Sequence, residues 1–128
     1  MGVIADFGSY PEWATGVRSA EVLETAPDGR ALRVRFGLDA GVIRDSYVLA
    51  YEWDGDAAVR WRLHEPGSMV TEMTGAYVLI EDGPGTKVIY DLAVGTRVPM
   101  IGLLKRRAEK TIIDTALRGL KSRAESIP

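Results

Sequence analysis

Hydrophobic and polar residues follow three different patterns along the chain. Residues 2–14 form short apolar groups interrupted at Gly8-Ser9, and they predict two short helices, with Pro11 in the first turn of the second, where a missing N–H costs nothing. Across residues 17–96, apolar side chains recur at every second position, which is typical of half-buried strands. Across residues 100–125 they recur every three or four positions, which predicts one long amphipathic helix.

Turn sequences divide the alternating region into six strands. They are, in chain order, Pro27-Asp28-Gly29, Asp39-Ala40-Gly41, Asp54-Gly55, Glu65-Pro66-Gly67-Ser68 and Gly83-Pro84-Gly85. An Asp-Gly pair tolerates the positive φ that two-residue hairpin turns require. Because short turns join consecutive strands, we expect an antiparallel meander.

The order of these elements predicts where a ligand would bind. A sheet with one apolar face must cover that face, and the long C-terminal helix is the element able to do so. A strongly twisted sheet curls, and a helix about 10–12 Å across cannot fill the whole concave side. We therefore predict an α+β fold, a curved sheet of about six antiparallel strands wrapped on the helix, with a gap between them.

Composition supports a single folded domain over residues 1–128. Hydrophobic residues make up 46% and charged residues 27% of the chain, which argues against disorder. A net charge of −2 gives no general attraction for nucleic acid, so we expect no DNA partner; the one basic cluster is Lys105-Arg106-Arg107.

The residue types present also limit which metal sites and cofactors the chain could bind. There are no cysteines and one histidine, and no carboxylates show a ligand spacing, so we expect no metal and no cofactor. No apolar stretch approaches the roughly 20 residues that span a bilayer, and the start of the chain does not look like a signal peptide. We therefore expect no stable membrane insertion and a cytoplasmic location.

Several short motifs resemble one protein family along nearly the whole chain. They are Asp6-Phe7-x-x-Tyr10-Pro11-x-Trp13, Ala20-Glu21-Val22-Leu23-Glu24, Gly75-x-Tyr77-x-Leu79, Gly85-Thr86-x-Val88, Lys105-Arg106 and Asp114-x-Ala116-Leu117-x-x-Leu120-Lys121. The first is fairly specific; the others are supportive. Together they resemble the polyketide cyclase/dehydrase and lipid transport superfamily (SRPBCC, START-like), in its cyclase/dehydrase or coenzyme-Q-binding-like branch. The resemblance implies the helix-grip fold and an apolar ligand.

One feature departs from that family. Its members usually begin with a strand before the first short helix, whereas this chain starts inside the predicted helix. Either that strand has been lost, or a partner supplies an equivalent one. Since an open sheet edge can pair with another strand, a homodimer through this edge is one hypothesis.

Strand parity places apolar and aromatic residues of the sheet toward the helix, and helical spacing places apolar residues of the helix toward the sheet. With Trp13 of the second short helix, these are the predicted ligand-binding residues. They are Trp13, Phe36, Tyr47, Tyr51, Trp61, Leu63, Met73, Tyr77, Tyr90, Leu104, Ala108 and Ile112. The inward tyrosines carry most interest, because a buried hydroxyl needs a polar partner that a ligand can supply.

Residues suited to acid–base chemistry are few. Asp45 shares parity with Tyr47, so it is the candidate for a catalytic base; the alternative places it at the strand end, beside Arg44 and facing water. His64 alternates with Leu63 and is expected to face solvent. No catalytic triad or phosphate-binding loop is present in the sequence.

Three functions follow as hypotheses. The first is a module that binds a lipid, quinone or polyketide-like molecule. The second is a cyclase, aromatase or dehydratase, which would need an inward polar group with a shifted pKa. The third is a macromolecular-interaction protein resembling the ribosome-association toxin branch, with Lys105-Arg106-Arg107 as its contact.

Overall fold

The structure is a computed structural model that describes residues 1–14, 16–39, 44–97 and 102–127, apart from the side chains of residues 102–105 and 108. Its elements are α1 (Gly2–Ala5), the 3₁₀ turn η1 (Phe7–Ser9), α2 (Tyr10–Trp13), β1 (Val17–Thr25), β2 (Ala31–Asp39), β3 (Arg44–Asp54), β4 (Ala58–Glu65), β5 (Val70–Asp82), β6 (Gly85–Thr96) and α3 (Gly102–Ser126). The N-terminal region therefore has a 3₁₀ turn between its two short helices, where the sequence predicted only a kink.

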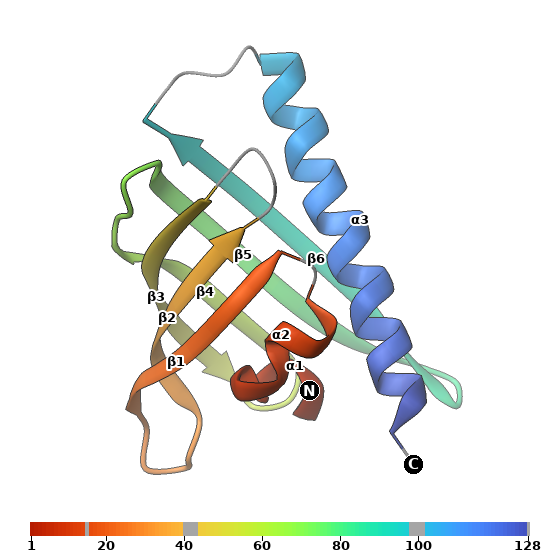
Figure 1. Cartoon of the computed structure of the whole chain (residues 1–128). Coiled ribbons are helices and arrows are strands. Elements are labelled where there is room, and N and C mark those ends of the chain that lie inside the picture. Colours follow the sequence, from red (N-terminus) through yellow and green to blue (C-terminus); the bar gives the residue numbers. More distant parts are fainter. Residues whose placement is uncertain (15, 40–43, 98–101, 128) are drawn as a thin grey trace.

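The six strands form one antiparallel sheet in chain order, β1 to β6, as the turn sequences predicted (Figure 1). Gly55 and Gly83 adopt positive φ values of 52° and 57° in two of the hairpin turns. L-residues with a side chain rarely adopt this conformation, so glycine makes both tight turns possible.

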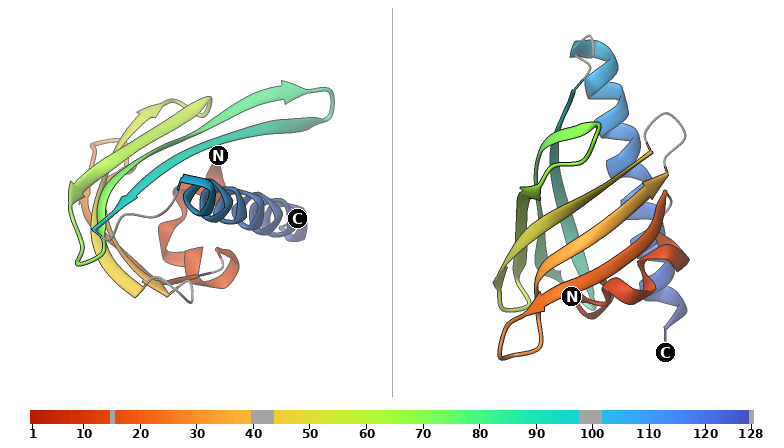
Figure 2. Two further views of the ribbon diagram at one scale, coloured as in Figure 1. Left: turned by 90° about the horizontal axis from the view of Figure 1, so that it is seen from above. Right: turned by 60° about the vertical axis from the view of Figure 1, so that its left-hand side comes forward.

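The sheet curls around the C-terminal helix. Seen from above, α3 lies on the concave side, and the short N-terminal helices lie beside it (Figure 2). Its nearest neighbours are β6, α1 and α2. Close to the C-terminal end of α3, a side chain at Gly119 would lie 2.5 Å from the Trp13 carbonyl, so glycine allows α2 and α3 to touch. The predicted START-like helix-grip fold is confirmed.

Period-two alternation separates an inner face, toward α3, from an outer face. The outer face carries exposed ion pairs that link neighbouring strands: Arg33 with Glu24, Arg35 with Glu65 and Arg62 with Glu52. Such exposed pairs contribute about 0–1 kcal/mol each. The free energy of folding therefore comes mainly from the inner face.

The sheet has two edges, β1 and β6. The register between β1 and β2 is irregular at three places, whereas β6 pairs regularly with β5 except near Val70 and Glu72. At the β6 edge, the backbone N–H of Val94 donates to Glu109 Oε2 of α3 over 2.8 Å.

Candidate functional site

The inner face of β2 and β3 is largely covered. Phe36, Tyr47 and Tyr51 are buried there, and Phe7 of η1 and Tyr10 of α2 both pack on Phe36. Phe7 lies 4.9 Å from the rings of both Tyr10 and Tyr51, and 6.1 Å from Phe36, in tilted or edge-on geometries that favour aromatic pairs. We call this region the buried half of the sheet.

The inner face of β5 and β6 is different, because α3 covers it incompletely. Its apolar side chains pack against the core yet stay partly exposed; they are Met73, Leu79, Val88, Tyr90, Leu92 and Val94. On the facing helix, Ile112, Ile113 and Leu117 are also partly exposed. We call this region the open half. A filled core would bury these residues, so the open half offers apolar surface that a ligand can cover.

Aromatic rings connect the two halves. The Trp61 ring lies 5.8 Å from Tyr51, 5.4 Å from Tyr77 and 5.7 Å from Tyr90. The indole lies across Gly75 of β5, where a Cβ atom would come within 2.3 Å of the ring. Glycine at this position therefore makes room for the indole at the border between the halves.

Five tyrosine hydroxyls lie close enough to influence one another electrostatically. Burial raises the pKa of Tyr51 well above its usual value, and the nearby hydroxyls of Tyr10, Tyr47, Tyr77 and Tyr90 raise it further. Burial likewise raises the pKa of Tyr77, and that of Tyr47 to about 12. All of these hydroxyls stay protonated at neutral pH, so each can donate a hydrogen bond.

The hydrogen bonding of these hydroxyls differs. Tyr10 donates to the carbonyl oxygen of Ile4, which ties α2 to α1. Within the described residues, the hydroxyls of the other four tyrosines make no hydrogen bond to the protein. These four, Tyr47, Tyr51, Tyr77 and Tyr90, are named the tyrosine cluster below.

Trp13 carries a buried donor next to Tyr10. Its ring lies 4.8 Å from that of Tyr10, and its Nε1 is the one buried side-chain polar atom without a hydrogen-bond partner in the described part of the chain. Leaving a buried donor unpaired costs about 1–3 kcal/mol.

Asp45, the predicted candidate base, lies near one member of the tyrosine cluster, since its charge adds to burial in raising the pKa of Tyr47, but its carboxylate is bonded elsewhere. Its carboxylate accepts hydrogen bonds from the backbone N–H groups of Ser46, Ser68, Met69 and Val70 at 2.7–3.0 Å, and from the Ser68 hydroxyl. These partners occupy its lone pairs and tie the β4–β5 turn (residues 66–69) to β3. The geometry supports a structural role for this carboxylate. It matches neither of the two predicted alternatives, a catalytic base or a carboxylate that faces water at the strand end.

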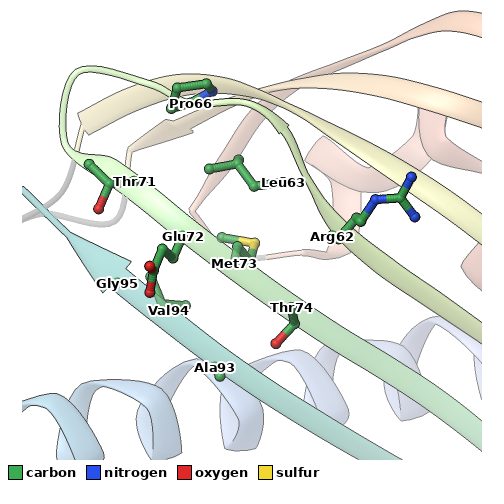
Figure 3. Close-up of a pocket in the computed structure, with 10 residues that line it drawn as sticks. All are labelled: Arg62, Leu63, Pro66, Thr71, Glu72, Met73, Thr74, Ala93, Val94 and Gly95. Carbon is green, nitrogen blue, oxygen red and sulfur yellow. The ribbon is translucent and has the colours of Figure 1, made fainter.

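A pocket of about 440 Å³ lies beside this turn (Figure 3). It is lined by Arg62, Leu63, Pro66, Thr71, Glu72, Met73, Thr74, Ala93, Val94 and Gly95. Both faces of the sheet contribute to it, as expected for a gap between strands. We call it the strand-split pocket.

The structure brings most of the predicted ligand-binding residues together, but not all. Ring contacts join Phe36 to Tyr47, and Tyr51 to Trp61, Tyr77 and Tyr90. Phe7 links these two groups, and Trp13 joins the first through Tyr10. Leu63 and Met73 line the strand-split pocket, and Ile112 is half-buried on α3. The side chains of Leu104 and Ala108 lie outside the described residues. His64 is exposed, as expected.

Sequence reasoning did not single out Arg62, Thr71 and Thr74 as pocket residues. The Pro66-Gly67 pair was the available signal, since it marks a turn whose geometry separates the two strands. In the described residues, no three metal-binding side chains gather, and no helix is long and apolar enough to cross a membrane.

Comparison with known families identifies the chain. A sequence model described as "Polyketide cyclase / dehydrase and lipid transport" matches residues 1–125. The chain belongs to this family. No curated protein matches it.

Solved structures agree on the fold of this polyketide cyclase/dehydrase and lipid transport family member. A START superfamily protein from Mycobacterium smegmatis is 21% identical with a TM-score of 0.86, covering 99% of this chain and 88% of its own. A protein from Thermus thermophilus is 23% identical with a TM-score of 0.77, covering 98% and 86%. The Zhui aromatase/cyclase from Streptomyces sp. R1128 is 16% identical with a TM-score of 0.77, covering 97% and 83%.

Proposed function

We propose that this chain binds a small hydrophobic molecule that carries oxygen atoms, such as a quinone or a polyketide-like compound, between α3 and the open half of the sheet. Family and fold point to hydrophobic ligand binding or polyketide cyclase activity. The observation that carries the proposal is the tyrosine cluster, a group of protonated hydroxyls without protein partners beside incompletely covered apolar surface.

The ligand's chemistry follows from the two kinds of surface. The partly exposed side chains of β5, β6 and α3 gain about 25 cal/mol for each Å² of apolar surface that a ligand covers. The tyrosine hydroxyls can donate hydrogen bonds to a carbonyl or hydroxyl oxygen of the ligand. A saturated hydrocarbon would use only the first kind of surface.

Acid–base catalysis is the second hypothesis, and it has less support. The buried residues of the described chain include no charged side chain, so the interior lacks a carboxylate or histidine to move protons. Burial raises the pKa of the tyrosines, which favours them as hydrogen-bond donors over bases. We therefore propose binding as the primary function.

The macromolecular-interaction hypothesis would fit a filled core better than this open half.

The proposal predicts that a ligand's oxygens matter for affinity. We expect 1,8-dihydroxyanthraquinone to bind and quench tryptophan fluorescence, and we expect Tyr77→Phe or Tyr90→Phe to weaken its binding about fivefold, the value of one hydrogen bond. Anthracene should bind the wild type and these variants alike, because it accepts no hydrogen bond.

Tyr10→Phe is the matched control for this titration. Its hydroxyl already donates to the Ile4 carbonyl, so its loss should lower stability without a selective effect on the anthraquinone. If Tyr77→Phe and Tyr90→Phe left the anthraquinone affinity unchanged, or if Tyr10→Phe weakened it equally, the tyrosine cluster would not be the binding site.

A homodimer through a sheet edge remains a proposal, and β6 is the better edge for it. Its regular pairing with β5 leaves a more uniform template than the bulged β1. We expect native mass spectrometry to show a dimer; a monomer at all concentrations would refute the proposal. A cytoplasmic location and the absence of a DNA partner stay predictions from sequence.

A further inference from the structure

The strand-split pocket arises because β4 and β5 stop pairing before either strand ends. Their register runs from Ala58↔Val78 to Arg62↔Thr74 and goes no further. Continued by one step, it would place Leu63 opposite Met73. Instead, residues 63–65 pair only with β3 and residues 70–73 only with β6. One edge of each segment therefore faces the split without a partner strand.

The β4–β5 turn is fixed from both sides, so the split is a built feature. On the β3 side, Asp45 holds Ser68, Met69 and Val70 through their backbone N–H groups. On the β6 side, Arg97 donates its backbone N–H to the Met69 carbonyl over 2.7 Å and its Nε to the Ser68 carbonyl over 2.9 Å. Closing the split would break this set of contacts.

The lining combines an apolar floor with two opposite charges. Leu63, Met73 and Val94 hold inner-face positions and are partly exposed. Arg62 and Glu72 hold outer-face positions, are exposed, and come from the two separated strands (Figure 3). They form no ion pair with each other, although both line the same pocket.

The two charges are free to bind a ligand. Arg62 has only a long contact of 3.5 Å with the exposed carboxylate of Glu52, which contributes little to stability. Glu72 forms no ion pair within the described residues, and its carboxylate lies against Gly95, where a Cβ atom would come within 3.1 Å of it. A simple anion would be attracted by Arg62 but repelled by Glu72. A simple cation would be attracted by Glu72 but repelled by Arg62.

We propose that the strand-split pocket binds a small apolar zwitterion, an amino acid or a dipeptide, with its carboxylate on Arg62 and its ammonium on Glu72. A molecule of this kind gains from both charges and places its apolar part over Leu63 and Met73. The volume, about 440 Å³, is within the range of small-ligand sites. The unpaired strand edges offer backbone groups that a peptide unit can bind. This proposal does not depend on the tyrosine cluster.

Three peptides separate the contributions of the two charges. The probe is the dipeptide Leu-Leu, compared with N-acetyl-Leu-Leu, which lacks the ammonium group, and Leu-Leu amide, which lacks the carboxylate. Titrations of ¹⁵N-labelled protein followed by NMR should show shifts in the backbone amides of the pocket residues. Each modified peptide should bind about two- to fivefold more weakly than Leu-Leu, because it loses one exposed ion pair.

Variants of the protein then assign each charge. Arg62→Gln should weaken Leu-Leu and N-acetyl-Leu-Leu but not the amide, whereas Glu72→Gln should weaken Leu-Leu and the amide but not N-acetyl-Leu-Leu. Arg60→Gln is the matched control, because Arg60 is an exposed outer-face arginine of the same strand that does not line the pocket. Equal binding of all three peptides, unchanged affinity in both variants, or no shifts at the pocket would overturn the proposal. Tyr77→Phe should leave dipeptide binding unchanged, so the two proposals fail separately.

Discussion

Replacing Phe7 with alanine should lower the free energy of unfolding by about 3–5 kcal/mol, the usual cost of removing a buried aromatic side chain. Phe7 is 1% exposed, and its ring meets those of Tyr10, Phe36, Tyr51 and Trp53. Because these rings come from α2, β2 and β3, the cavity could not close without moving the N-terminal helices off the sheet. Urea unfolding followed by tryptophan fluorescence measures the change.

The control for Phe7→Ala is Leu23→Ala, because Leu23 is 42% exposed on the edge strand β1. It should change the free energy of unfolding by well under half as much. Domains of this size have total stabilities of about 5–15 kcal/mol, so Phe7→Ala should leave a marginal fold. A cost below about 1 kcal/mol would mean that η1 does not hold the buried half together.

Replacing Asp45 with alanine should cost about 2–3 kcal/mol at neutral pH, because the β4–β5 turn would lose its acceptor. Two backbone N–H groups of the turn, that of Val70 at the start of β5 and the Ser68 hydroxyl bind this carboxylate. Hydrogen bonds to a charged group are worth about 1.5–3 kcal/mol. Water can replace some of these bonds, since Asp45 is only half-buried. Gly67 leaves the space that the carboxylate occupies, because a Cβ at this position would overlap it.

The effect of Asp45 should depend on pH. Burial alone would raise the pKa of Asp45, but the hydrogen bonds from the Val70, Met69, Ser46 and Ser68 backbones outweigh it and lower the pKa. A carboxylate with a lowered pKa in the folded state stabilises the fold above its unfolded pKa of about 3.9, and this stabilisation is lost as the pH falls through the folded value. The gap between wild type and Asp45→Ala should therefore narrow below about pH 4.

Asp91→Asn is the control for this pH series. Asp91 is exposed on β6 and makes no hydrogen bond or ion pair within the described residues, so its replacement should leave the unfolding curves nearly unchanged at every pH. An Asp45→Ala protein as stable as wild type at neutral pH would show that the carboxylate does not hold the turn.

Strand parity was enough to predict which aromatic residues share a face. Tyr47, Tyr51, Trp61 and Tyr77 lie at alternate positions in three strands, and an antiparallel register keeps them on one side of the sheet. How deeply each is covered could not be predicted in the same way. That depends on how far α3 stands from each strand, which the packing of α1, α2 and β6 sets.

The role of Asp45 lay beyond sequence reasoning for a different reason. Its partners in the β4–β5 turn are 23–25 residues away, and parity alone allowed an inward or a solvated carboxylate but not a contact with this turn. The end of pairing after Arg62↔Thr74 is also a tertiary property. Alternation continues through both strands, so the sequence reads as though they pair along their full length.

The contrast between the buried half and the open half means that the packing that stabilises the fold is unevenly distributed through the molecule. Leu120, near the C-terminal end of α3, is the one buried side chain among those described for this helix, and it lies one residue beyond the contact of Gly119 with Trp13. Among the described side chains of the helix, burial is thus concentrated near Leu120, whereas the middle section rests on half-covered residues. Local opening there exposes less new apolar area than opening of β2 and β3 would, so its free-energy cost is lower. A molecule bound over the open half would therefore act as a removable part of the hydrophobic core, and its presence would even out the rigidity of the two halves.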